Sequence, residues 1–256
     1  MLAVTRKQKI KEIIMEKKSA SVAELAQLFS VTDETIRRDL KVLEQEGVLL
    51  RSYGGAFIQS GVENLVEADI RTTIYVENKM KIANQCRKMI NNGDAIFLDN
   101  STTAYYIARA IQDMRITLVT NNLQIINLLS QNKTIHLIVI GGTFSHTEQA
   151  FYGVAAKKAL EGYFVDKAFL SCRSLSIKNG ITEANDRWAQ MRQTVIERSK
   201  ESYVVADFSK FDQTSFMRIC GYEKIKAIIT DKPLSEEWHQ AMAKYGCTII
   251  DQLDNI

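Results

Sequence analysis

The 256-residue sequence predicts an α/β protein that is built from two parts. The first observation is a run of three short helical segments, followed by two strand-like segments around a pair of glycines, which is the order of a winged helix-turn-helix. The second is the alternation, from residue 95 onward, of short apolar segments with amphipathic ones, which predicts a mostly parallel sheet with helices on both faces. We therefore expect a winged helix-turn-helix over residues 1–57, a linker over residues 58–76, and an α/β domain over residues 77–256.

The amino-terminal helices are predicted from their apolar spacing and their caps. Isoleucines recur at the spacing of one helical face within residues 6–18. Ser21 and Glu24 have the spacing of a capping box, so the second helix is expected to begin directly after Ser21. Thr32 is a suitable N-cap for the third helix, because two carboxylates follow it in the first turn, where the helix dipole favours them.

The third helix, which is expected to end at Gly47, has the pattern of a DNA-recognition helix. Its apolar residues are spaced to pack against the first two helices, so its arginine and lysine side chains point outward. Such a helix can enter the major groove, where its first turns reach base edges and later basic residues hold phosphates. The next segment predicts a wing around Gly54 and Gly55, with Arg51 near the DNA backbone or minor groove. The expected DNA-binding residues are Thr32, Thr35, Arg37, Arg38, Lys41, Arg51 and Tyr53.

A three-helix unit of this size can also serve as a dimerisation or protein-binding module, and a pair of arginines on a helix is often only a solvated face. Charge alone does not decide between these roles, because residues 1–60 contain 10 Lys or Arg against 8 Asp or Glu. The order of cap, turn, outward-pointing arginine and glycine pair favours DNA binding.

The rest of the chain predicts seven strands and the helices between them. The expected strands are 95–98, 116–120, 135–140, 167–171, 202–207, 227–230 and 247–251. The expected helices lie near 104–111, 122–130, 153–162, 187–199 and 235–245. In an open parallel sheet, ligands bind beyond the carboxyl ends of the strands, so the segments that follow the strands are the candidate site.

Residues suited to a phosphorylated, hydroxyl-rich ligand gather after these strands. Ser101, Thr102 and Thr103 stand at the start of a helix, where free N–H groups and the helix dipole favour an anion, although simple N-capping would also explain them. Lys210 would be a point-charge partner for a phosphate. The segment 180–183 is expected to be a loop after the fourth strand. The expected effector-binding residues are Asp99, Asn100, Ser101, Thr102, Thr103, Asn121, Asn122, Gly141, Gly142, Arg173, Thr182, Glu183, Asp207 and Lys210.

Several segments of the sequence resemble segments that are typical of one protein family. TIRRDLKVLEQEGVLLRSYGGA closely resembles the amino-terminal signature of the DeoR family of bacterial sugar-operon regulators, and DNSTT, GGTF, VDKAF, NGITEAND and ADFSKF resemble its effector domain. The resemblance implies a carboxy-terminal fold similar to that of sugar-phosphate isomerases and glucosamine-phosphate deaminases. The chain has Tyr53 where the family usually has His, and Asn100 where it often has Gly. Cys172 and Arg173 lie in a stretch that replaces the family's glycine-rich loop.

The expected function is that of a cytoplasmic, sequence-specific transcription regulator, preferably a repressor, of a carbohydrate-utilisation operon. Its expected partners are double-stranded operator DNA and a phosphorylated sugar or sugar alcohol. Because operators are usually two-fold symmetric, we expect a homodimer or homotetramer. No apolar run reaches the length of about 18 residues that a membrane span needs. The four cysteines and three histidines are scattered, so we expect no metal, no disulfide framework and no cofactor.

Two other functions are possible on the same residues. An isomerase or deaminase acting on sugar phosphates could use Asp99, Glu183 or Asp207 as its general base, but such an enzyme needs no DNA-binding module and these loops contain no histidine. A regulator that binds a nucleotide cofactor would need a GxGxxG turn between a strand and a helix, and the sequence has none. We therefore expect no catalytic residues.

Overall fold

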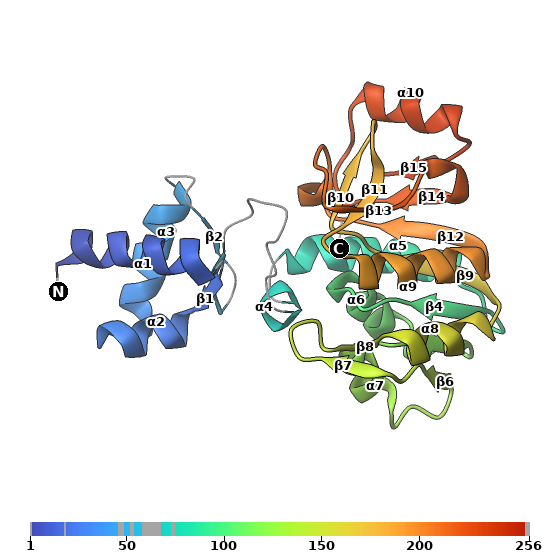
Figure 1. Ribbon diagram of the computed structural model, residues 1–256, viewed down its shortest axis with the longest axis horizontal. Coiled ribbons are helices and arrows are strands. Elements are labelled where there is room, and N and C mark those ends of the chain that lie inside the picture. The colour runs from blue at the N-terminus through green and yellow to red at the C-terminus, as the bar shows by residue number, and fades with distance from the viewer. Residues whose placement is uncertain are drawn as a thin grey trace. The chain divides into compact units, whose positions relative to one another are not determined.

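The computed structural model describes residues 2–17, 19–45, 49–51, 54–57, 68–72 and 75–253. The chain divides into two compact units, Met1–Val76 and Glu77–Ile256, and each has an apolar core of its own (Figure 1). Gly47 and Tyr53 lie outside the described residues, as does most of the predicted linker. The cap at Gly47, the role of Tyr53 and the linker over residues 58–76 therefore stay predictions.

The amino-terminal unit contains the three predicted helices. They are α1 (Ala3–Lys17), α2 (Val22–Phe29) and α3 (Asp33–Gln45). The capping box before α2 is confirmed, because the Ser21 hydroxyl accepts the Glu24 N–H and the Glu24 carboxylate accepts the Ser21 N–H. Thr32 is confirmed as a cap, since its hydroxyl accepts the Thr35 N–H at 3.3 Å. Between α2 and α3, Ser30 takes up a left-handed conformation (φ 53°), which ends α2 and turns the chain into α3.

The wing is a three-stranded antiparallel sheet rather than the predicted pair of strands. Its strands are β1 (Ser19–Ser21), β2 (Leu50–Arg51) and β3 (Gly55–Phe57), in the order β1-β3-β2. The sequence analysis missed β1 because three residues are too few to show an apolar alternation. The pairing of β1 with β3 also explains a glycine of the wing, because a Cβ on Gly55 would lie 2.2 Å from the carbonyl oxygen of Ala20.

Two helices precede the sheet of the second unit. The short helix α4 (Ala68–Thr72) falls within the predicted linker, and α5 (Val76–Met89) was not among the predicted helices. Along α5, Lys79, Ile82, Ala83 and Cys86 are buried at helical spacing. One of these four buried residues is a lysine, and many of the neighbouring residues are charged. The sequence of α5 therefore shows no clear apolar face.

The carboxy-terminal unit is organised around a seven-stranded sheet, and every pairing in it is parallel. All seven predicted strands are confirmed within one or a few residues at their ends. Their order places β4, the first of them along the chain, between β5 and β9. The chain therefore winds in one direction from β4 to β6 and in the other from β9 to β15, so the β4/β9 boundary is the topological switch point. The strands are β4 (Ala95–Leu98), β5 (Thr117–Thr120), β6 (His136–Val139), β9 (Val165–Leu170), β12 (Ser199–Val205), β14 (Ala227–Ile229) and β15 (Thr248–Ile250).

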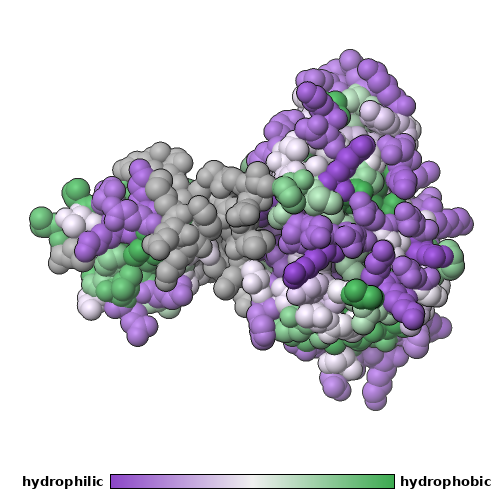
Figure 2. Space-filling model, in the orientation of Figure 1, coloured by the Kyte–Doolittle hydropathy of each residue, from purple (hydrophilic) through white to green (hydrophobic). Residues whose placement is uncertain are grey.

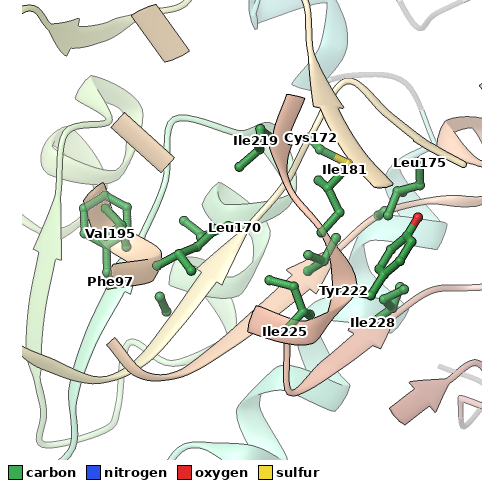
Figure 3. Packing of buried hydrophobic residues seen from close by; sticks show 14 of the residues in the cluster. Phe97, Leu170, Cys172, Leu175, Ile181, Val195, Ile219, Tyr222, Ile225 and Ile228 are labelled. Carbon is green, nitrogen blue, oxygen red and sulfur yellow. The ribbon is translucent and has the colours of Figure 1, made fainter. Parts of the chain in front are cut away.

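Helices cover the sheet, and the five predicted ones are confirmed. They are α6 (Thr102–Ala110), α7 (Leu123–Leu129), α8 (Val154–Glu161), α9 (Asp186–Glu197) and α10 (Glu236–Lys244). Alternate strand residues such as Phe97 and Leu170 belong to one apolar cluster with residues of α8, α9 and α10. Figure 3 shows part of this cluster, in which Phe97 and Leu170 lie near Val195 of α9. The intervening strand residues, such as Ile96 and Leu98, face the other side of the sheet.

Smaller elements lie beyond the strand ends. The hairpin β7 (Thr143–Ser145) and β8 (Ala150–Tyr152) follows β6. A second antiparallel sheet contains β10 (Ser174–Ser176), β11 (Gly180–Glu183) and β13 (Met217–Cys220). In the sequence, the 3-10 turn η1 (Phe208–Lys210) precedes β13, and the 3-10 turn η2 (Tyr222–Lys224) follows it. The prediction of a loop at 180–183 is therefore wrong. These four residues are all buried between two partner strands, a tertiary arrangement that a four-residue pattern does not reveal.

Among the described residues, no helix combines the length and the apolar character that crossing a membrane requires. The face of the second unit seen in Figure 2 is mostly hydrophilic, with apolar side chains scattered over it.

Candidate nucleic-acid interface and effector site

The recognition helix α3 has the two faces that its sequence predicts. Ile36, Leu40 and Leu43 are buried against the other helices. Arg37, Arg38 and Lys41 are exposed, and Thr35 is half-buried. The Arg38 guanidinium lies 3.5 Å from Glu34, but the two side chains are 79% and 68% exposed, so water screens this pair and Arg38 stays accessible to a phosphate or base.

Thr32, Thr35 and Arg51, three of the predicted DNA-binding residues, have hydrogen bonds within the unit. The Thr32 hydroxyl caps α3 and lies 3.0 Å from the Thr35 hydroxyl. The Arg51 Nε donates to Glu44 at 2.7 Å, and the Arg51 backbone N–H donates to the same carboxylate at 3.0 Å. Glu44 thus holds the wing strand against α3, and a DNA phosphate would compete with Glu44 for Arg51. The contact of all seven residues with DNA stays a prediction.

At the switch point of the large sheet, Asp99 joins the ends of two strands. Asp99 follows β4, and its Oδ1 accepts the Ser101 N–H at 3.0 Å. Its Oδ2 accepts the N–H of Ser171, which follows β9, at 2.9 Å. Because β4 and β9 flank the switch point, this one carboxylate fixes the floor of the predicted site.

Arg192 of α9 is the central residue of this floor, and the sequence analysis did not find it. Its guanidinium donates to Asp99 at 3.0 Å, to Glu183 at 2.7 Å and to the Asn100 side-chain oxygen at 3.2 Å. Burial lowers the pKa of Arg192, but the two neighbouring carboxylates outweigh burial and raise the pKa above its ordinary value. In the sequence, Arg192 stands four residues after Trp188 and three before Val195, so it falls on the apolar face of the helix. This spacing could have identified it.

The two carboxylates of the floor are occupied by hydrogen bonds. Asp99 accepts three of them, and Glu183 accepts one from Arg192 and a second from the Ala184 N–H at 2.6 Å. The geometry therefore gives Asp99 and Glu183 the task of holding neighbouring loops in place.

The start of α6 lies beside Asp99. Ser101 is the N-cap of α6, and its hydroxyl accepts the Ala104 N–H at 3.0 Å. This confirms the capping that the sequence analysis considered as an alternative to ligand binding. The N–H groups of Thr102 and Thr103 belong to the first turn, where a helix offers no carbonyl four residues earlier, and both residues are buried. Capping and anion binding can therefore coexist at this helix start.

Three asparagines border the same place. The Asn122 side chain caps α7 through its oxygen, while its nitrogen is 3.4 Å from the backbone oxygens of Asp99 and Ser101. The Asn121 nitrogen donates to Phe151 at 2.8 Å. Within the part of the chain that the structure describes, the buried Asn121 side-chain oxygen has no hydrogen-bond partner. The Asn100 nitrogen is 3.3 Å from Glu148, a residue of the β7–β8 hairpin.

Of three further predicted effector residues, Gly142 and Thr182 have structural tasks. Gly141 and Gly142 are exposed. Gly142 has φ +150°, and a Cβ there would lie 2.6 Å from the Tyr152 carbonyl oxygen, so the hairpin needs a glycine at this position. The Thr182 hydroxyl donates to Ser174 at 3.2 Å and accepts the Ser215 N–H at 2.9 Å. These bonds already use both the donor and an acceptor of the hydroxyl.

The remaining predicted residues lie around Cys172. Burial raises the pKa of the Cys172 thiol, and the charge of Lys210 opposes this shift. Asp207 caps the turn η1 by accepting the Ser209 N–H at 3.0 Å. The Arg173 N–H donates to the Thr182 carbonyl at 3.0 Å, and its side chain is half-buried. Ligand binding by the whole set stays a prediction.

Comparison with known proteins identifies both units. Residues 6–61 match the DeoR-like helix-turn-helix domain, and residues 74–232 match the DeoR C terminal sensor domain. The chain belongs to the DeoR family. It is therefore a DNA-binding transcription regulator with a sensor domain and not an enzyme, and the isomerase alternative is set aside.

The relatives span nearly the whole chain. YulB of Bacillus subtilis, an uncharacterized HTH-type transcriptional regulator, is 38% identical over 91% of each chain. The L-fucose operon activator of Haemophilus influenzae is 32% identical over 90% of this chain and 93% of that one. The transcriptional repressor GlcR of B. subtilis is 26% identical over 94% and 93%. Among solved structures, ribose 5-phosphate isomerase A of Methanocaldococcus jannaschii is similar over 52% of this chain and 53% of that one, with 18% identity and a TM-score of 0.39.

Proposed function

We propose that this regulator represses a carbohydrate-utilisation operon in the cytoplasm and releases its operator when a phosphorylated sugar or sugar alcohol binds the sensor domain. Membership of the DeoR family supports the regulatory role. The observation that carries the choice of ligand is the polar edge of the sheet. There, a helix start follows β4, an amide oxygen without a partner among the described residues follows β5, and a lysine follows β12.

The chemistry of this edge suits both parts of such a ligand. The first-turn N–H groups of α6 and the Lys210 ammonium would bind the phosphate. The buried Asn121 oxygen lacks a donor among the described residues, and a sugar hydroxyl would supply one. Each of the three guanidinium nitrogens of Arg192 donates to a protein acceptor, so we assign Arg192 to support of the site rather than to the phosphate.

The proposal includes a dimer or tetramer, because a two-fold operator is bound by a two-fold symmetric protein. Sedimentation of the protein on operator DNA tests this part. A single protomer on the bound operator would contradict it.

A thermal-shift screen against phosphorylated sugars and sugar alcohols tests the ligand class. A ligand present at about 100 times its Kd adds roughly 2.7 kcal/mol to the stability of the domain that binds it. Lys210→Ala should weaken that binding about tenfold, the effect of losing about 1.4 kcal/mol of charge-assisted hydrogen bonding. Lys224→Ala, an exposed lysine of η2, is the matched control. Equal ligand affinity in both variants would remove Lys210 from the site.

The sign of regulation is tested by deleting the gene and measuring transcription of the operon that the protein binds. A repressor predicts higher transcription in the deletion strain without the sugar. Lower transcription would make this protein an activator, as the name of the L-fucose relative describes that protein.

A further inference from the structure

The loop that carries Lys210 is connected to helix α5 through one carboxylate. Asp231 follows β14, and its Oδ1 accepts the Phe208 N–H at 2.8 Å. Its Oδ2 accepts a short hydrogen bond from the Asn78 side chain, in the first turn of α5. The Asp231 side chain thus connects Asn78 with Phe208, which are 130 residues apart in the sequence.

Phe208 is held on two sides, so this connection is firm. Its N–H is bonded to Asp231, and the Lys232 ammonium lies 3.4 Å from the centroid of its ring, which adds a cation–π attraction. Phe208 also opens the turn η1, which ends at Lys210. The Lys210 N–H donates to the Asp207 carbonyl at 3.1 Å. This carbonyl and the Phe208 N–H belong to one planar peptide unit, so a shift of the Lys210 backbone also shifts the Phe208 N–H.

The other end of the connection lies where the chain enters the second unit. Asn78 is the second residue of that unit, which begins at Glu77. Helix α5 therefore receives the chain directly from the segment that follows the DNA-binding domain. Further along α5, the buried side chains of Ile82 and Cys86 hold the helix in place. A change at the first turn of α5 is therefore passed to the residues that precede the helix.

We infer that Asp231 is a positioning residue that couples the Lys210 loop to the first turn of α5, and so carries the effector signal toward the linker. This inference rests on the proposed function, because it takes Lys210 as a ligand contact. In this coupling, ligand binding changes the geometry of η1, and the Asp231 carboxylate transmits the change to Asn78. The first turn of α5 then shifts from one of its conformations toward another.

Amide hydrogen exchange on the full-length protein tests the coupling, with inorganic phosphate as the probe and sodium chloride at the same ionic strength as the reference. In the wild-type protein, phosphate should slow exchange at the Phe208 amide and in the first turn of α5, each by about fivefold or more, the lower end of ordinary coupling between sites.

Asn78→Asp breaks the connection, because it sets a carboxylate against Asp231. Phosphate should then still slow exchange at Phe208 but leave α5 unchanged. The double variant Asn78→Asp/Asp231→Asn exchanges donor and acceptor and restores the bond, so the response of α5 should return. Asn84→Asp is the matched control, since it makes the same substitution at an exposed position of the same helix. Asn78→Ala removes the donor without adding a charge. It replaces Asn78→Asp if that variant folds poorly, and phosphate should again slow exchange at Phe208 but not in α5.

The outcomes separate this inference from the proposed function. Phosphate that protects the loop but not α5 in the wild-type protein overturns the coupling alone. A full α5 response in Asn78→Asp, or no recovery in the double variant, also overturns it. No effect of phosphate on the wild-type loop overturns the effector site, and the coupling with it.

Discussion

Each unit of this protein buries an arginine, but the two arginines have different surroundings. In the amino-terminal unit, Arg6 of α1 pairs with Asp39 of α3, and each side chain is 9% exposed. In the carboxy-terminal unit, Arg192 bonds two carboxylates and an amide oxygen. The first arrangement joins two helices of an apolar core, whereas the second joins the ends of strands around the candidate effector site.

The difference shows what a buried charge does in each unit. A single buried ion pair can often be replaced by well-packed apolar side chains at little cost in stability. A cation with three partners on two segments is harder to replace, because its removal would leave two buried carboxylates, Asp99 and Glu183, without their positive charge. Arg6 therefore serves the packing of the helices, and Arg192 serves the shape of a site.

Arg192→Met should have the largest effect. It leaves Asp99 and Glu183 buried without their cation, and breaking a buried pair in this way costs about 3–5 kcal/mol. Both tryptophans lie in the carboxy-terminal unit, so urea unfolding followed by tryptophan fluorescence reports on that unit. Lys158→Met, at an exposed position of α8, should change stability by less than about 0.5 kcal/mol. Similar losses in both variants would refute the role given to Arg192.

Arg6→Met should cost less, about 1.5–3 kcal/mol, because it removes hydrogen bonding to one carboxylate. The double variant Arg6→Met/Asp39→Leu should recover most of this stability. Thermal melting followed by circular dichroism measures the loss, while the tryptophan transition should stay in place. A double variant no more stable than Arg6→Met would show that this pair is as irreplaceable as the Arg192 cluster.

Arg38→Ala should leave both units stable and weaken operator binding by about 1–3 kcal/mol, which is roughly 5- to 150-fold. If Arg38 reads a base, binding to random DNA should weaken less. Lys9→Ala, which removes an exposed charge from α1, is the control. Titration of labelled duplexes measures both affinities, and a wild-type operator affinity would refute the placement of α3 in the groove.

Glu44→Gln should have the smallest effect, in the opposite direction. It releases Arg51 from an exposed ion pair worth about 0.2–1 kcal/mol and removes a negative charge near the DNA, while the Gln oxygen can still accept the Arg51 N–H. DNA affinity should rise about two- to fivefold, with a steeper dependence on salt concentration. Weaker binding would instead mean that the Glu44–Arg51 ion pair holds the wing in its binding shape.

Local patterns predicted much of this fold. Helix caps such as Ser21 and Thr32 act within one turn, and the seven strands of the large sheet are continuous apolar segments, so both can be found in a short window of sequence. Among the segments that were missed or mistaken, β1, α5 and β11 are short or carry charges on a buried face. Their structure depends on partner segments that lie elsewhere in the chain.

The sequence by itself determined the two-part organisation, the outward face of the recognition helix and the family, because these follow from periodicity and from contiguous strings. Only the tertiary structure decided that Arg192 bonds Asp99, Glu183 and Asn100 at the candidate site. Asp99 and Arg192 are 93 residues apart, and they meet because β4 and β9 adjoin at the switch point with α9 packed over them. A buried charge is stable only beside its partners, and a partner brought near by folding is not visible in a linear sequence.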